Sequence, residues 1–211
     1  RPGGERHAPA PRSPVIIRGA VLAGGGSTRF EGRPKGLESV GGRRILDRVI
    51  EALTEGLGEP PLLVANHPEA AEWAPGLRVV SDTRPGLGAL GGIYTAVIET
   101  PAPVVCVAWD MPFVSAGLVR ALADSLEMVD LCLPESGGPR GVEPLCAIYG
   151  PACAGAIERS VAENDLRAIG FHRHVGVGIL RETTVRRYGD PDRLFFNVNT
   201  AADLTRAQGL V

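Results

Sequence analysis

A glycine-rich loop that ends in a lysine is the clearest sign of chemistry in this chain. Residues 22–35 read Leu-Ala-Gly-Gly-Gly-Ser-Thr-Arg-Phe-Glu-Gly-Arg-Pro-Lys and follow an apolar run. Backbone N–H groups of such a loop can close around a phosphate. Of the 22 lysine and arginine residues, Lys35 is the lone lysine, and its compact ammonium is not reproduced by arginine's planar fork. We therefore expect the loop to wrap a triphosphate whose charge Arg29 and Lys35 offset. The alternative is that the single lysine falls here by chance.

This loop differs from two common phosphate-binding motifs. It is not a Walker A loop, because no Gly-Lys-[Ser/Thr] opens the following helix. It is not a dinucleotide fingerprint, because Arg29 stands where the third glycine belongs and Asn66 ends the second predicted strand in place of an acid.

Two aspartates follow later predicted strands. Asp82 opens the glycine- and proline-rich segment 81–92, whose backbone can approach a ligand closely. Asp110 comes just after an apolar strand at 104–108. One or two carboxylates together with substrate phosphates are the ordinary ligands of Mg²⁺ in proteins, so we predict that Asp110 binds Mg²⁺. For both aspartates, the alternative is a role in capping a nearby helix.

A pair of asparagines near the C-terminus forms a fourth candidate. Asn197 and Asn199 are two residues apart in a predicted strand, and such a spacing places both side chains on one face. Thr200 can cap the last helix, with Asp203 at the capping-box position. The alternative is that the asparagines serve only the turn and the cap.

The elements that position these residues alternate between strand and helix patterns, which predicts βαβ units and an α/β fold with a mostly parallel sheet. The predicted strands are 15–22, 62–65, 77–80, 104–108, 128–133, 142–149, 176–180 and 194–198. The predicted helices are 45–55, 90–100, 115–126, 151–163 and 201–208. Ligands of open α/β sheets bind beyond the carboxyl ends of the strands, where the four candidate segments lie.

Composition limits the class of protein. The 211 residues fit one domain at 15–211, preceded by a mobile tail at 1–14. The net charge of −2 gives no long-range attraction for nucleic acid or an anionic membrane, and no apolar run reaches the ~20 residues of a membrane span. The four cysteines lack CxxC spacing, which favours reduced, buried thiols in a cytoplasmic protein over a disulfide or zinc site.

Taken together, the segments resemble the molybdenum cofactor guanylyltransferase family over roughly residues 18–208. The resemblance rests on these stretches: Leu22-Ala23-Gly24-Gly25 with Ser27, Arg29, Gly32 and Lys35; Asp82 before a glycine-rich turn; Asp110-Met111-Pro112-Phe113; Glu143-Pro144-Leu145; and Phe196-Asn197-Val198-Asn199-Thr200. Phe30 and Pro34 depart from the family, whose members carry methionine after the loop arginine and an acid before the lysine.

The resemblance implies a Rossmann-like three-layer α/β/α sandwich of the nucleotidyltransferase type. It implies transfer of GMP from GTP to the phosphate of Mo-molybdopterin, with Mg²⁺ as cofactor and transient contact with proteins that insert or receive the finished cofactor. The implied catalytic residues are Arg29, Lys35 and the metal ligand Asp110. The implied nucleotide-binding residues are Leu22, Ala23, Gly24, Gly25, Lys35, Asn66, Asp82 and Asp110. Asn197 and Asn199 fall on the pterin side, and Glu143 is a further candidate for that side.

Two other functions stay open. Cytidylyltransferase relatives usually read Leu-Ala-Ala-Gly in the first motif, so Gly24 favours guanine over CMP transfer to molybdopterin or nucleotide transfer to a sugar phosphate. A non-catalytic nucleotide-binding subunit is the other alternative. The presence together of Lys35, Asp82 and Asp110 argues against it, because a subunit that only binds can lose any of the three.

Overall fold

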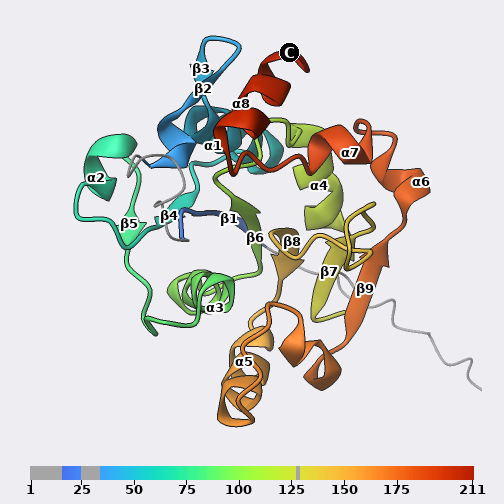
Figure 1. Cartoon of the computed structure of the whole chain (residues 1–211). Helices are drawn as coiled ribbons and strands as arrows, with labels where there is room; N and C mark the ends of the chain where they lie inside the picture. The colour runs from blue at the N-terminus through green and yellow to red at the C-terminus, as the bar shows by residue number, and fades with distance from the viewer. Residues whose placement is uncertain (1–15, 25–33, 127–128) are drawn as a thin grey trace, which may run out of the picture.

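A seven-stranded sheet forms the centre of the computed structural model, which describes residues 16–24, 34–126 and 129–211 (Figure 1). The tail predicted at 1–14 lies outside these residues. In order across the sheet the strands are β5 (Val79–Val80), β4 (Leu62–Val64), β1 (Arg18–Leu22), β6 (Val104–Ala108), β8 (Cys146–Tyr149), β7 (Leu131–Pro134) and β9 (Val177–Leu180). All neighbours are parallel except that β8 runs antiparallel to β6 and β7. The prediction of a mostly parallel α/β sheet is confirmed.

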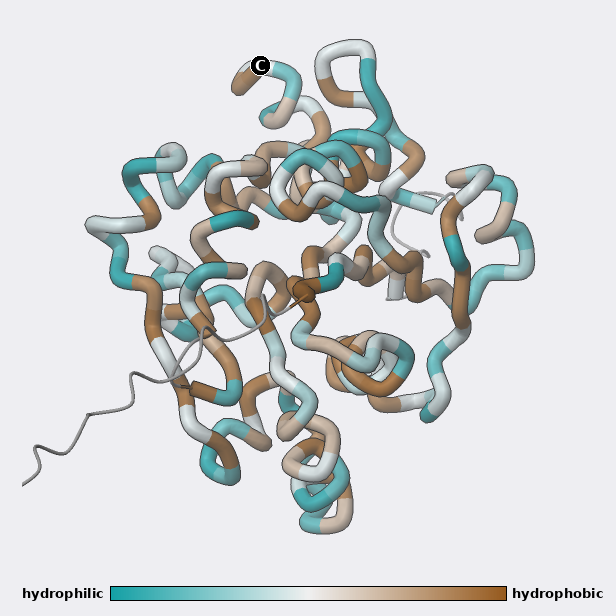
Figure 2. Tube along the Cα trace, turned by 180° about the vertical axis from the view of Figure 1, so that it is seen from behind, coloured by the Kyte–Doolittle hydropathy of each residue, from teal (hydrophilic) through white to brown (hydrophobic). Residues whose placement is uncertain are grey.

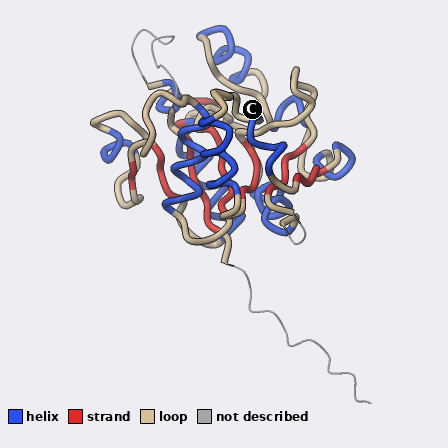
Figure 3. The backbone as a smooth tube through the Cα atoms, turned by 90° about the horizontal axis from the view of Figure 1, so that it is seen from below, coloured by secondary structure: helices blue, strands red, loops and turns tan. Residues whose placement is uncertain are grey.

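Helices cover both faces of the sheet, which confirms the three-layer arrangement (Figures 1 and 3). One face packs against α1 (Ile45–Leu57) and α4 (Ala116–Asp124), and the other against α3 (Ala89–Glu99) and α5 (Cys153–Ala162). Side chains alternate between the two cores as strand geometry requires: Val21 faces the first, and Ala20 faces the second. Figure 2 shows the apolar segments running through the middle of the molecule.

Shorter elements complete the chain. They are η2 (Lys35–Leu37), the antiparallel pair β2 (Ser39–Val40) and β3 (Arg43–Arg44), α2 (Ala70–Trp73), η3 (Gly170–His174), α6 (Glu182–Val185), α7 (Pro191–Leu194) and α8 (Ala201–Gln208). Of these, only α8 was predicted. Its start is confirmed in detail, because Thr200 and Asp203 form a reciprocal capping box.

The strand predicted at 194–198 is wrong. Asp190 accepts a hydrogen bond from the N–H of Asp192, and Pro191 occupies the first turn, so a short helix, α7, begins here and ends at Leu194. The following residues form a loop, in which the N–H of Val198 donates to the backbone carbonyl of Asp110 at 2.9 Å. The chain is therefore fixed to the loop after β6 and adds no strand to the sheet.

The cysteines behave as expected, since all four are free and buried. Among the described residues, none of the helices combines the length and the apolar character needed to cross a bilayer.

Candidate active site

A cavity of about 360 Å³ opens at the carboxyl ends of the central strands. It is lined by Leu22, Gly24, Lys35, Val64, Ala65, Asn66, Asp82, Gly88, Ala89, Gly92, Ala108, Trp109, Asp110, Arg140, Glu143, Leu145, Asn197 and Asn199. Eight residues predicted for the site are among them. Ala23 is not, because its side chain packs into the core under α1 and α4. Gly25 and Arg29 lie outside the described residues.

Lys35 joins three segments of the chain at the middle of this cavity. Its ammonium donates to Asp110 Oδ2 and, at 2.8 Å, to Asn199 Oδ1. The lysine side chain is 15% exposed and the aspartate side chain 9%, so the charge pair is largely screened from solvent. An ion pair in such a position interacts more strongly than one on an open surface. The lone lysine therefore has two specific side-chain partners in a mostly buried position.

Asp110 carries the feature that fits a metal ion. Its second oxygen, Oδ1, is buried and has no hydrogen-bond partner among the residues that the structure describes, and a buried acceptor left unpaired is costly. A hard divalent cation prefers such an oxygen. The alternative that Asp110 caps a helix is wrong, because Ser115 is the N-cap of α4. No group of three or more His, Cys, Asp or Glu side chains suited to a metal occurs in the described ranges, so Asp110 would bind an ion together with ligand oxygens.

A stack of aromatic rings packs against η2, the turn that carries Lys35. The rings of Trp73 and Trp109 stack with centroids 5.2 Å apart, and the centroid of the His67 ring lies 4.9 Å from that of Trp73. Trp109 is 2% exposed. A Cβ on Gly36 would lie 2.3 Å from a ring carbon of Trp109, so only glycine lets the turn approach this closely. No pattern in the sequence indicates this contact between residues 73 positions apart.

Asp82 is held by Asn66 at one end of the cavity. The amide of Asn66 donates to Asp82 Oδ2 at 2.8 Å, and its carbonyl oxygen accepts from the N–H of Asp82 at 2.7 Å. The alternative that Asp82 caps α3 is wrong, since the N-cap of that helix is Gly88. This pairing leaves Asp82 Oδ1 outside the Asn66 contact.

Different residues form the opposite end of the cavity, beyond β8. Glu143 accepts a hydrogen bond from the N–H of Leu145 at 3.0 Å. Burial raises the pKa of Glu143, while the N–H of Leu145 and the charge of Arg140 act in the opposite direction. Asn197 donates to the carbonyl of Phe195 at 2.9 Å. Asn197 and Asn199 both line the cavity, as expected for site residues. They do so from a loop, and not from the strand predicted at 194–198.

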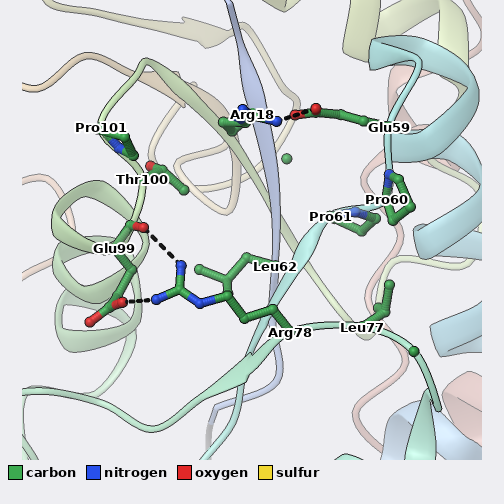
Figure 4. A pocket seen from close by; sticks show the side chains of 12 residues that line it. Arg18, Glu59, Pro60, Pro61, Leu62, Leu77, Arg78, Glu99, Thr100 and Pro101 are labelled. Atoms are coloured by element: carbon green, nitrogen blue, oxygen red, sulfur yellow. Dashed lines mark hydrogen bonds and ion pairs between the residues drawn. The ribbon is translucent and has the colours of Figure 1, made fainter.

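A second cavity, of about 270 Å³, lies at the amino ends of the same strands (Figure 4). Arg18 there pairs with Glu59, and Arg78 pairs with Glu99. Both of its arginines are thus already neutralised. The carboxyl-end cavity, with converging charges and an unpartnered buried oxygen, is the better candidate for chemistry.

Comparisons with known proteins show the family. Residues 19–176 match the family described as MobA-like NTP transferase domain. A probable molybdenum cofactor guanylyltransferase of Pelotomaculum thermopropionicum is 36% identical over 191 residues, which cover 90% of this chain and 91% of the relative.

Solved structures show the same fold. The molybdopterin-guanine dinucleotide biosynthesis protein A of Archaeoglobus fulgidus matches with a TM-score of 0.75 and 25% identity, covering 92% of this chain and 97% of that one. A Mycobacterium tuberculosis protein crystallised in complex with manganese matches with a TM-score of 0.64 and 19% identity, covering 93% and 100%. The last likeness shows the fold alone.

The contact between Gly36 and Trp109 yields a test of how the turn is held. In Gly36→Ala the added methyl overlaps a buried ring, so we expect a loss of about 1–3 kcal/mol in the free energy of unfolding. Because Trp73 and Trp109 are the chain's two tryptophans, we also expect a shifted tryptophan emission spectrum. Chemical denaturation and fluorescence measure both.

Gly155→Ala is the matched control. Gly155 lies in α5, and a Cβ there meets nothing within 4 Å. An alanine in a helix interior is favourable by roughly 0.5–1 kcal/mol. If Gly36→Ala unfolds at the same denaturant concentration as the wild type, the proposed support of the turn is wrong.

Proposed function

The chain belongs to the MobA-like NTP transferase family, and from that premise we propose that it transfers GMP from GTP to the phosphate of Mo-molybdopterin. The products are molybdopterin guanine dinucleotide and pyrophosphate. The observation that carries this proposal is the meeting of Lys35, Asp110 and Asn199 at the middle of one cavity. Asp82 and Asn66 lie toward one end of it, and Glu143 and Asn197 toward the other.

The two ends suit two substrates. We assign the nucleotide to the end under β1, β4 and α3, where Leu22, Gly24 and Asp82 line the cavity. The pterin takes the end lined by Asn197 and Asn199. Arg29, Ala23 and Gly25 stay assigned to the nucleotide through the family motif, as part of the loop that we expect to bind the triphosphate. With this placement the reacting phosphates meet beside Asp110.

The reaction is an in-line displacement that needs no protein nucleophile, because the attacking phosphate is already anionic. An oxygen of the pterin phosphate forms a bond to the α-phosphorus of GTP, and the bond from that phosphorus to the β-phosphate bridging oxygen breaks. The leaving pyrophosphate takes the electron pair. Lys35 would stabilise charge on the phosphates, and the cavity would hold the reacting groups in line.

Asp110 is the residue that would bind Mg²⁺, and the unpartnered Oδ1 atom supports this. When bound there, the ion would neutralise phosphate charge as that charge moves toward the leaving group. Lys35 already pairs with the other oxygen, so the carboxylate would bridge two cations.

Residues 15–211 would act as one domain, in the cytoplasm that contains the GTP pool. The protein would make transient contact with proteins that insert or receive the cofactor.

Gly24 supports guanine as the base. A Cβ built at Gly24 meets nothing within 4 Å among the described residues, so the volume that an alanine methyl takes in cytidylyl relatives is here open to the ligand. A larger purine can use that space and the exposed backbone amide.

We expect GTP with Mg²⁺ to raise the melting temperature more than CTP, ATP or UTP at equal concentration. A ligand that binds the native state stabilises it according to its concentration over its dissociation constant. Differential scanning fluorimetry gives the ranking, and Gly24→Ala is expected to narrow the gap between GTP and CTP. A larger shift with CTP in the wild type would replace the guanylyl assignment with the cytidylyl one.

Lys35→Arg tests the lone lysine. The ammonium reaches Asp110 and Asn199 from a mostly buried position, and the longer planar guanidinium cannot occupy the same point. We expect GMP transfer to fall at least about tenfold, or ~1.4 kcal/mol of transition-state stabilisation. Arg43→Lys is the reverse exchange at an exposed ion pair and is expected to be silent. Transfer by Lys35→Arg within about twofold of the wild type would contradict the assigned role.

Asp110→Asn tests the metal ligand. Removing the charge weakens Mg²⁺ binding at the reacting phosphates, so we expect the transfer rate to fall about a hundredfold, as when a preorganised charge-stabilising group is lost. We expect the affinity for GTP to fall much less, because backbone amides of the glycine-rich loop would also bind the nucleotide. The measurement is a titration of transfer rate against Mg²⁺, in which excess metal restores part of the loss. Superimposable curves for the two proteins would remove Asp110 from the metal site.

A further inference from the structure

Arg140 is a cation on the pterin side of the cavity that the sequence did not single out. It lines the cavity with Glu143, Leu145 and Asn197, and its side chain is exposed. It forms no hydrogen bond or ion pair with any residue in the described ranges, whereas most arginines there pair with a carboxylate or a backbone carbonyl. A guanidinium in a cavity with its donors unused is ready to bind an anion.

The loop that carries Arg140 is closed by its own backbone. Glu135 and Val142 form a β-bridge, the N–H of Ser136 donates to the carbonyl of Gly141 at 3.0 Å, and the N–H of Gly141 donates to Gly138 at 2.9 Å. Gly141 has a φ of 70°, which lets the chain reverse directly after Arg140. Arg140 therefore sits on a formed turn between β7 and β8.

Side-chain contacts fix this loop against the segment that leads to the asparagines. The carboxylate of Glu135 accepts from Arg181 Nη1 and from the N–H of Glu182, both at 2.7 Å. A Cβ on Gly137 would lie 3.0 Å from Asp192 Oδ1 in α7, the helix that precedes Asn197. Figure 1 shows α6 and α7 following one another at the upper right, above β9. Arg140 thus belongs to the half of the cavity opposite Asp82.

Among the described residues that line the cavity, Arg140 is the cation that forms no ion pair. Its described lining residues include three carboxylates, of Asp82, Asp110 and Glu143, and two cations, Lys35 and Arg140. Lys35 is paired with Asp110. The proposed reaction brings the phosphate of a second substrate against a triphosphate, and their mutual repulsion must be offset on both sides.

We propose that Arg140 binds the phosphate monoester of the second substrate and orients its attacking oxygen toward the α-phosphorus of GTP. The guanidinium offers two parallel N–H donors, which match two oxygens of a phosphate. The third oxygen stays free to attack. This inference rests on the proposed function, and it makes Arg140 a determinant of the acceptor, not of the nucleotide.

Steady-state kinetics on Arg140→Ala, Arg140→Lys and the wild type test the role. For Arg140→Ala we expect the KM for Mo-molybdopterin to rise at least about tenfold, the size expected for a hydrogen-bonded charge pair. The KM for GTP and the thermal shift with GTP and Mg²⁺ are expected to stay within about twofold. Arg140→Lys keeps the positive charge but loses the two parallel N–H donors of the guanidinium. We expect its KM for Mo-molybdopterin to lie between those of the wild type and Arg140→Ala.

Arg187→Ala is the matched control, because Arg187 is exposed, has no partner among the described residues and does not line the cavity. It removes the same charge from the protein and is expected to leave both KM values unchanged. An unchanged KM for Mo-molybdopterin in Arg140→Ala, or an equal rise in Arg187→Ala, would overturn the inference.

Direct binding separates this inference from the proposed function. Mo-molybdopterin binding to each protein is measured by quenching of Trp73 and Trp109, which stack beside the cavity. Binding that weakens in Arg140→Ala while the wild type transfers no GMP would overturn the function and support the role of Arg140. Equal affinity in both proteins overturns the inference whether or not transfer occurs. No binding to the wild type overturns both.

Discussion

The ammonium of Lys35, held between Asp110 and Asn199, is the contact on which the candidate site depends. The three residues come from the turn η2, the loop after β6 and the loop before α8. A single compact cation gathers segments separated by 75 and 164 positions, and the backbone bond from Val198 to Asp110 fixes the same two loops a second time. Because the pair is largely buried, losing either partner would leave an uncompensated charge or acceptor. The position therefore tolerates little change.

Sheet topology explains why these loops meet. From β1 the chain moves outward to β4 and β5, then crosses back to β6 on the other side of β1. The order of strands reverses between β1 and β6, and such a switch point opens a crevice at the carboxyl ends. Gly24 follows β1 and Asp110 follows β6, so the glycine-rich loop and the metal-binding candidate come from adjacent strands. The half of the cavity that we assign to the nucleotide extends from there toward β5.

The antiparallel strand β8 gives the cavity its second half. Because β8 enters the sheet between β6 and β7, the connection from β7 turns back at the same end as the active-site loops. That connection brings Arg140 and Glu143 to the cavity opposite Asp82. An all-parallel sheet would have placed a crossover helix there. The departure from parallel order thus gives the cavity a second half, to which we assign the acceptor substrate.

Signals within a few residues determined much of this protein from sequence alone: the place of Gly24 and Lys35 in the candidate site, the place of Asp110 after a buried strand, and the Thr200–Asp203 capping box. Each depends on neighbours in the chain, so local chemistry is enough. Tertiary structure decided the rest. Periodicity reports which side chains are buried but not which group receives a backbone N–H, so residues 194–198 were predicted as a strand although Val198 donates to Asp110. The pairing of Asn66 with Asp82, the approach of Gly36 to Trp109 and the position of Arg140 arise from contacts between distant segments, which form only when the sheet is assembled.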